Sequence, residues 1–242
     1  MKRIAVLVVA ALAALLAGCM FYPKVEGSGI LITSAYPLAG FSKISADQVC
    51  RLHVVPDTVF SVTVTCDDNL RPYLEVRQNG FDSVEIGLRQ GYSYRNVTFA
   101  ADVHMPVLIG LDLSGASEAR VEPGFSSSLP ISLTASGASL IDITGLACGS
   151  ITADLSGASS LSVTGAAVDM SVVASGASSA NLQGCAAGGA NVLLSGASIC
   201  RVDVGTGLIT IAASGASTLY YRGSPTFSVL NLSGASRVVK VY

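Results

Sequence analysis

Serine beside glycine is the feature of this sequence best suited to chemistry. The tetrapeptide Ser-Gly-Ala-Ser occurs seven times, starting at residues 114, 136, 156, 175, 195, 214 and 233. A serine nucleophile needs a base to take its proton, and α/β-hydrolases present it in a G-x-S-x-G turn. The sequence has no such turn, and both of its histidines, His53 and His104, precede the first copy. We therefore interpret the repeat as structural and expect no serine hydrolase.

Clustered carboxylates would indicate a different chemistry, because polysaccharide-cleaving β-helices place several of them together with a cation and a base. From residue 136 onward only eight charged residues occur, scattered over different positions of the repeat. Asp112 and Asp154 hold equivalent positions but are two repeats apart, roughly 10 Å in a stack of strands. Arg201 and Asp203 are expected to form an exposed surface pair. No metal or other cofactor is expected, and a carbohydrate-active enzyme on a β-helix remains the alternative function.

The cysteines suggest structure more than reactivity. Cys50 and Cys66 flank a Val-Val-Pro-Asp-Thr-Val segment typical of a hairpin turn, so a disulfide could join them across two strands. Cys148, Cys185 and Cys200 have no metal-ligand spacing, no CxxC pattern and no nearby histidine. We expect these three to be small buried hydrophobic residues or loop thiols.

The positions around the repeat predict its architecture. Apolar residues occupy the first and third positions before each copy and the fifth and seventh positions after its first serine, except for Lys240 in the last copy. Mixed types lie between them. This period of two predicts a strand on each side of a corner, and a repeat of 19–22 residues predicts stacked coils. The corner glycine would adopt positive φ, the alanine would point inward, and the serine hydroxyls would bond freed backbone groups. The corner glycines are Gly115, Gly137, Gly157, Gly176, Gly196, Gly215 and Gly234.

The chain divides into four segments. Residues 1–18 form a signal peptide: Lys2 and Arg3 precede an apolar run that is too short to span a bilayer. Leu16-Ala17-Gly18-Cys19 resembles the lipobox of bacterial lipoproteins, which implies cleavage before Cys19 and acylation of that residue. Residues 19–29 are expected to be a tether, and 30–242 a β-solenoid domain. Within it, residues 30–113 are irregular opening rungs and 114–242 carry the repeats.

An ordered set of short motifs resembles a known bacterial family. Residues 38–45 (Leu-Ala-Gly-Phe-Ser-Lys-Ile-Ser) are followed by 68–74 (Asp-Asn-Leu-Arg-Pro-Tyr-Leu), 84–88 (Val-Glu-Ile-Gly-Leu) and 103–106 (Val-His-Met-Pro). This order is similar to the "putative auto-transporter adhesin, head GIN domain". The resemblance implies an all-β fold, a single-stranded right-handed parallel β-helix, with residues 41–113 forming its opening rungs. The family offers no established catalytic residues to carry over. The alanine after the corner glycine departs from its more polar corners.

Together these features predict a non-catalytic envelope protein with a surface-binding, adhesin-like or scaffolding role. It would be lipid-anchored, in the outer membrane if the host is Gram-negative. The formal net charge of −2 gives no support for nucleic-acid binding. The expected partners are the membrane, an envelope or glycan surface, or a second copy through the open C-terminal rung. The outward positions expected to bind are Arg120, Asp142, Asn181, Arg201 and Tyr220.

Overall fold

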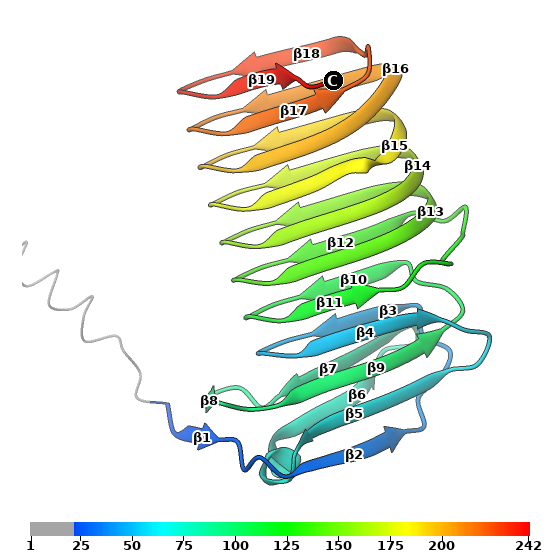
Figure 1. The fold of residues 1–242 in the computed structure, drawn as a ribbon, viewed down its shortest axis with the longest axis vertical. Helices are drawn as coiled ribbons and strands as arrows, with labels where there is room; N and C mark the ends of the chain where they lie inside the picture. The colour runs from blue at the N-terminus through cyan, green and yellow to red at the C-terminus, as the bar shows by residue number, and fades with distance from the viewer. Residues whose placement is uncertain (1–21) are drawn as a thin grey trace, which may run out of the picture.

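Two rows of parallel strands face each other along most of the molecule (Figure 1). The computed structural model describes residues 22–242, so the expected signal peptide and Cys19 lie outside the described residues. In each coil one strand leads into the Ser-Gly-Ala-Ser corner and the next strand leads out of it. We call the two rows the pre-corner sheet and the post-corner sheet. The predicted parallel β-solenoid is therefore confirmed.

The strands of both rows keep one register from coil to coil. The pre-corner sheet contains β3 (Lys43–Ala46), β10 (Gly110–Leu113), β12 (Ile131–Ala135), the C-terminal halves of β13 (Leu140–Leu155), β14 (Ser160–Ala174), β15 (Ser179–Leu194) and β16 (Ile199–Ala213), and β18 (Thr226–Leu232). The post-corner sheet contains β4 (Arg51–Pro56), β11 (Glu118–Val121), the N-terminal halves of β13 to β16, β17 (Thr218–Arg222) and β19 (Arg237–Lys240).

The core lies between the two sheets, where the apolar positions of the repeat meet. Leu133 of the pre-corner sheet and Ile141 of the post-corner sheet are both fully buried. Their neighbours in sequence point outward, as the period of two predicts. Among the described residues, no helix is long and apolar enough to cross a bilayer.

The corners stack through their backbones. All seven corner glycines have φ between 67° and 75°. The N–H of the alanine in each repeat donates to a carbonyl one coil earlier; Ala158 N, for example, lies 2.7 Å from Gly137 O. A Cβ on Gly157 would lie 2.5 Å from that same carbonyl oxygen. Glycine is thus required both for the left-handed conformation and for the close approach of successive coils.

The expected place of the corner alanine was wrong. Ala158 is exposed, whereas Ser159 is only 1% exposed. The Ser159 hydroxyl lies 2.9 Å from Ser156 O and 3.0 Å from Ala135 O, and it donates to these carbonyls. The bend leaves carbonyls facing the interior, and an alanine there would give them no donor. The second serine of the repeat is therefore the interior residue.

A further corner precedes the first Ser-Gly-Ala-Ser. The segment Asp47-Gln48-Val49-Cys50 joins β3 to β4, and Gln48 has φ of 67°. The Ala116 N–H donates to Gln48 O, as later corners do to glycine carbonyls. Cys50 is fully buried at the place that the second serine takes in the repeats. None of its four residues matches Ser-Gly-Ala-Ser, so the repeat pattern does not predict this corner.

Residues 57–109 leave the coil after β4 and build a cap at the N-terminal end (Figure 1). Its strands are β5 (Ser61–Asp67), β6 (Leu74–Asn79), β7 (Ser83–Leu88), β8 (Ser93–Arg95) and β9 (Phe99–Met105), with the 3-10 helix η1 (Asp68–Tyr73) after β5. β7 and β9 stack in parallel on β3 and β4. The pairs β2 (Leu31–Tyr36) with β5, β5 with β9, and β6 with β7 are antiparallel. The opening region therefore contains antiparallel strands as well as parallel rungs.

The segment expected to be a tether is partly ordered into a strand. β1 (Lys24–Glu26) pairs in parallel with β8. The Asn69 amide in η1 also donates to Glu26 O at 2.7 Å. The chain is thus fixed to the cap from Lys24 onward.

Candidate functional site

A column of polar side chains runs along the outer surface of the post-corner sheet. Strand register aligns one residue from each of eight successive strands, and each residue takes the same outward position. Strands in a sheet are about 4.8 Å apart, so the column is roughly 34 Å long. This polar column consists of Asp102, His53, Arg120, Asp142, Ser162, Asn181, Arg201 and Tyr220.

The cap end of the column is a network of charges. His53 Nδ1 lies 3.0 Å from Asp102 Oδ1, and His53 Nε2 lies 3.2 Å from Glu122 Oε1. Arg120 Nε donates to the same Glu122 oxygen at 3.1 Å. Ionised carboxylates only accept hydrogen bonds, so both imidazole contacts can be hydrogen bonds together only when the ring carries both protons. The network links the cap strand β9 to the first two coils.

An open hollow of about 360 Å³ lies beside this network. Arg51 is opposite Ala100 in the strand register, and the small alanine leaves room on the outer surface. The hollow is lined by the polar residues Arg51, His53, Asp102, Glu118 and Arg120, with Leu52, Ala100 and Ala101. A ligand lying on the sheet would meet charges of both signs there.

This network holds the residue types that the enzymatic alternative requires. Two carboxylates, Asp102 and Glu122, flank His53, and an arginine is adjacent. They lie on an outward sheet surface, with side-chain exposures of 52% for Asp102 and 42% for His53. Among the described residues, no group of three histidine, cysteine or acidic side chains could hold a metal ion.

The far end of the column is organised differently from our expectation. The Arg201 guanidinium lies 5.0 Å from the centre of the Tyr220 ring. Asp203 pairs with Arg222 on the next coil, whose Nε donates to its carboxylate at 2.9 Å. The expected surface pair of Arg201 with Asp203 is therefore wrong. Asp203 and Arg222 face each other directly across neighbouring strands, whereas Arg201 and Asp203 are two positions apart on one strand.

The other candidate chemical groups have structural partners. The second serines of the first six repeats are buried. In all seven repeats the hydroxyl of the second serine donates to the carbonyl of the first, as Ser117 Oγ does to Ser114 O at 2.9 Å. His104 Nδ1 lies 3.1 Å from Asp57 Oδ2. The Val59 N–H and then the His104 imidazole bond the Asp57 carboxylate and lower its pKa.

The expected disulfide between Cys50 and Cys66 is not formed, and both thiols are free and buried. Cys50 directly precedes β4 and Cys66 lies in β5, but β9 runs between these two strands. Two strand spacings, about 9.6 Å, exceed the Cα separation of roughly 4.4–6.8 Å that a disulfide tolerates. The segment between them is thus not a hairpin turn. Burial raises the pKa of the Cys50 thiol to about 12.

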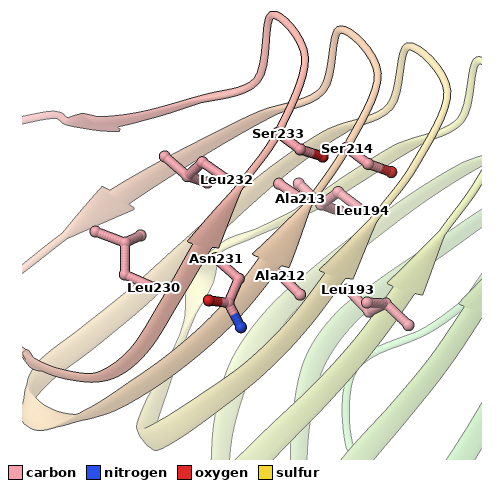
Figure 2. Close-up of a pocket in the computed structure, with 9 residues that line it drawn as sticks. All are labelled: Leu193, Leu194, Ala212, Ala213, Ser214, Leu230, Asn231, Leu232 and Ser233. Atoms are coloured by element: carbon pink, nitrogen blue, oxygen red, sulfur yellow. The ribbon is translucent and has the colours of Figure 1, made fainter.

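The last coil leaves apolar residues uncovered. Leu230 and Leu232 are 51% and 42% exposed, whereas Ile211 and Ala213 at the equivalent positions one coil earlier are buried. Figure 2 shows both leucines on β18, with Ala212 and Leu193 on the preceding coils. At the C-terminal end of the described stack, β18 pairs only with β16 and β19 only with β17, so each has one open edge.

Outward positions inside the repeats were predicted correctly, but the cap end of the column was missed. Arg120, Asp142 and Asn181 are exposed as expected. His53 and Asp102 precede the repeats, so no motif aligned them with Arg120. The apolar spacing around residues 47–50 was a usable signal, because residues 44, 46, 52 and 54 have the same offsets as in the repeats.

Several solved structures share this fold. A "putative adhesin" from Bacteroides fragilis NCTC 9343 is 20% identical, with a TM-score of 0.82 over 90% of this chain and all of its own. A "putative lipid binding protein" from Parabacteroides distasonis ATCC 8503 is 15% identical, with a TM-score of 0.74 over 90% of this chain and all of its own. A "putative adhesin" from Parabacteroides merdae ATCC 43184 is also 15% identical, with a TM-score of 0.66 over 91% of this chain and all of its own. The TM-scores show that these proteins share the fold of this chain, and at such low sequence identities they show the fold alone.

No curated protein matches this sequence. A sequence family does match it, over residues 40–225. That match covers well over half of the chain, from just before β3 into the last coils. It includes the corner at residues 47–50, the cap and six of the seven repeats. The chain therefore belongs to the family described as "Putative auto-transporter adhesin, head GIN domain".

Proposed function

We propose that this protein is a lipid-anchored protein of the bacterial cell envelope whose solenoid is a non-catalytic, adhesin-like binding surface. The polar column is the observation that carries the proposal. The family description and the adhesin names of two structural relatives support it.

The shape of the column favours an extended ligand. Sites for small molecules are usually concave and mostly apolar. The column is instead a straight row of donors and acceptors on an outer sheet surface, roughly 34 Å long. A polysaccharide chain offers hydroxyls along its whole length and can contact several coils at once. We therefore propose an envelope or surface glycan as the ligand.

Binding can be tested with chain 19–242 carrying Cys19→Ser, on a glycan array and on immobilised envelope polysaccharides. The double variant Asp142→Ala/Asn181→Ala removes two exposed groups from the middle of the column. Asp154→Ala removes an exposed carboxylate from the outer face of the pre-corner sheet and serves as the control. We expect at least about tenfold weaker binding for the double variant only, since each lost polar contact contributes about 1 kcal/mol. Equal binding by all three proteins would refute the column as the site.

The anchor needs a separate test in a bacterial host. The full-length chain should incorporate radiolabelled palmitate and sediment with membranes. The Cys19→Ser variant should do neither, since Cys19 is the proposed acylation site. Unchanged labelling of the variant would exclude Cys19. Confirmed anchoring without binding to any glycan would favour a scaffolding role.

A carbohydrate-active enzyme is the second candidate, because Asp102 and Glu122 flank His53 beside an open hollow. The polysaccharides that the protein binds should be examined for new reducing ends and unsaturated products. Cleavage by the parent protein, lost in Asp102→Asn while binding persists, would establish this function instead.

A further inference from the structure

The end of the cap that carries β1 is close in sequence to Cys19, the proposed site of acylation. Only five residue steps separate Cys19 from Lys24, where β1 begins. Fully extended, they span at most about 17 Å. If Cys19 is acylated, as proposed above, the surface around β1 must stay close to the bilayer.

Three elements form this surface. β1 pairs with β8, and η1 is bonded to the segment after β1: Asp68 N donates to Ile30 O at 2.8 Å. The loop before β8 joins them, because Arg89 N donates to Tyr73 O at the end of η1, also at 2.8 Å. Figure 1 shows β1, β8 and η1 at the same end of the stack, opposite β19. We call the exposed side of these elements the anchor-side surface.

Four basic side chains are exposed on this surface: Lys24, Arg71, Arg89 and Arg95. Lys24 and Arg95 lie on one face of the β1–β8 pair, because Val25 and Tyr94 turn the other way. None of these four takes part in an ion pair within residues 22–242. They are therefore available to an external anion.

Apolar and aromatic groups accompany the basic ones. Tyr22, Ile30 and Leu31 are 48%, 63% and 52% exposed in the same stretch of chain. At the end of η1 and in the segment leading into β8, the Tyr73 ring packs 4.8 Å from Tyr92 and 6.1 Å from Tyr94, centre to centre. Tyrosine with basic residues is the composition typical of a membrane–water interface.

Three acidic groups of this region accept internal hydrogen bonds. Glu26 accepts a hydrogen bond from the Asn96 amide at 2.7 Å, and Asp68 accepts one from the Ser28 hydroxyl at 2.6 Å. Asp67 is buried and accepts backbone N–H groups. Internal hydrogen bonds hold these three carboxylates in place, although Glu26 and Asp68 are themselves exposed and Glu26 lies opposite Arg95 in the strand register. The four exposed cations outnumber them.

We infer that the anchor-side surface binds anionic phospholipid headgroups and forms a second membrane contact beside the acyl chains. Basic residues near an anionic bilayer surface attract it within a Debye length. Exposed tyrosine and aliphatic side chains would enter the interfacial layer. The contact would set the orientation of the solenoid, which the short tether alone leaves free.

The test uses chain 19–242 with Cys19→Ser, which keeps every described strand and carries no acyl group. It should sediment with phosphatidylcholine vesicles that contain phosphatidylglycerol, less so as salt is raised, and not with phosphatidylcholine alone. The triple variant Arg71→Gln/Arg89→Gln/Arg95→Gln should bind at least about tenfold more weakly. Arg222→Gln/Arg237→Gln/Lys240→Gln, an equal change of charge at the opposite end, should bind like the parent.

Two outcomes would overturn the inference. The parent protein would fail to bind the anionic vesicles, or both triple variants would lose binding equally. Neither outcome bears on acylation, which palmitate labelling of Cys19 tests separately. A triple Arg→Lys variant at residues 71, 89 and 95 keeps the charges and should retain binding, which separates lost charge from lost folding.

Discussion

Gly176→Ala in a central corner should destabilise the solenoid far more than an ordinary glycine substitution. Gly176 has φ of 73°, and an added Cβ would lie 2.5 Å from Gly157 O in the preceding corner. That oxygen cannot simply move away, because it accepts the Ala177 N–H at 2.8 Å. The substitution therefore combines backbone strain with a clash against a stacked hydrogen bond.

The expected cost follows from these two parts. Forcing alanine into the left-handed region costs about 1–2 kcal/mol. Weakening the stacked hydrogen bond costs about 0.5–1.5 kcal/mol more. Together they lower the free energy of unfolding by about 1.5–3.5 kcal/mol. For a chain of this size, that corresponds to a fall in Tm of roughly 3–14 °C.

Two other glycines separate the contributions. Gly40 also has positive φ, 77°, but nothing lies within 4 Å of an added Cβ, so Gly40→Ala should cost only the backbone strain. Gly205 has neither constraint, and Gly205→Ala should be neutral or stabilise by up to about 1 kcal/mol. Thermal and urea unfolding of the three variants gives the comparison. A Gly176→Ala variant no less stable than Gly40→Ala would refute the close-approach argument.

Three further predictions concern buried polar groups. Ser159→Ala should lower stability by about 1–2 kcal/mol, since it removes the donor to two carbonyls, whereas Ser156→Ala, whose side chain is partly exposed, should change it little; urea unfolding of both checks this. Burial raises the pKa of Asp47, whose Oδ1 has no partner. Its charged form therefore opposes folding, so Asp47→Asn should stabilise at pH 7, and this gain should vanish below the unfolded pKa of about 3.9; no gain at pH 7 would contradict it. Cys50 and Cys66 should both be alkylated in denaturant without reductant, as mass spectrometry would show, and Cys50 should not react in the folded protein at pH 8.

The repeating part of the fold was readable from sequence because one physical constraint recurs in every coil. Each coil must bury alternate side chains and close one bend, so the same columns appear seven times. The interior of the corner was not readable in this way. Alanine is the more apolar choice for a buried position, but the carbonyls turned inward by the bend need a donor, and Ser159 provides it. Hydrogen-bond satisfaction outweighs hydrophobicity at that position.

The strand order of the cap was not predictable from the sequence for a different reason. Pairing of β5 with β9 and β2 joins segments far apart in the chain, and no local pattern specifies which strand lies between two others. The disulfide prediction failed on this point, since it assumed that consecutive strands β4 and β5 are neighbours. The same non-local pairing brings Asp102 beside His53, so the cap end of the polar column is visible only in the fold.

The corner chemistry constrains where function can lie. In every repeat the glycine, the second serine and the inward apolar positions are fixed by stacking, so their side chains have no freedom to recognise a ligand. Only the outward columns can vary without disturbing the coil. In the polar column these outward positions are Asp102, His53 and Arg120 near the cap and Arg201 and Tyr220 farther away. The proposed anchor precedes β1, which is paired with the cap, so the polar column extends from the end near the membrane to the coils farthest from it. A surface with this orientation can contact a polymer that lies away from the membrane.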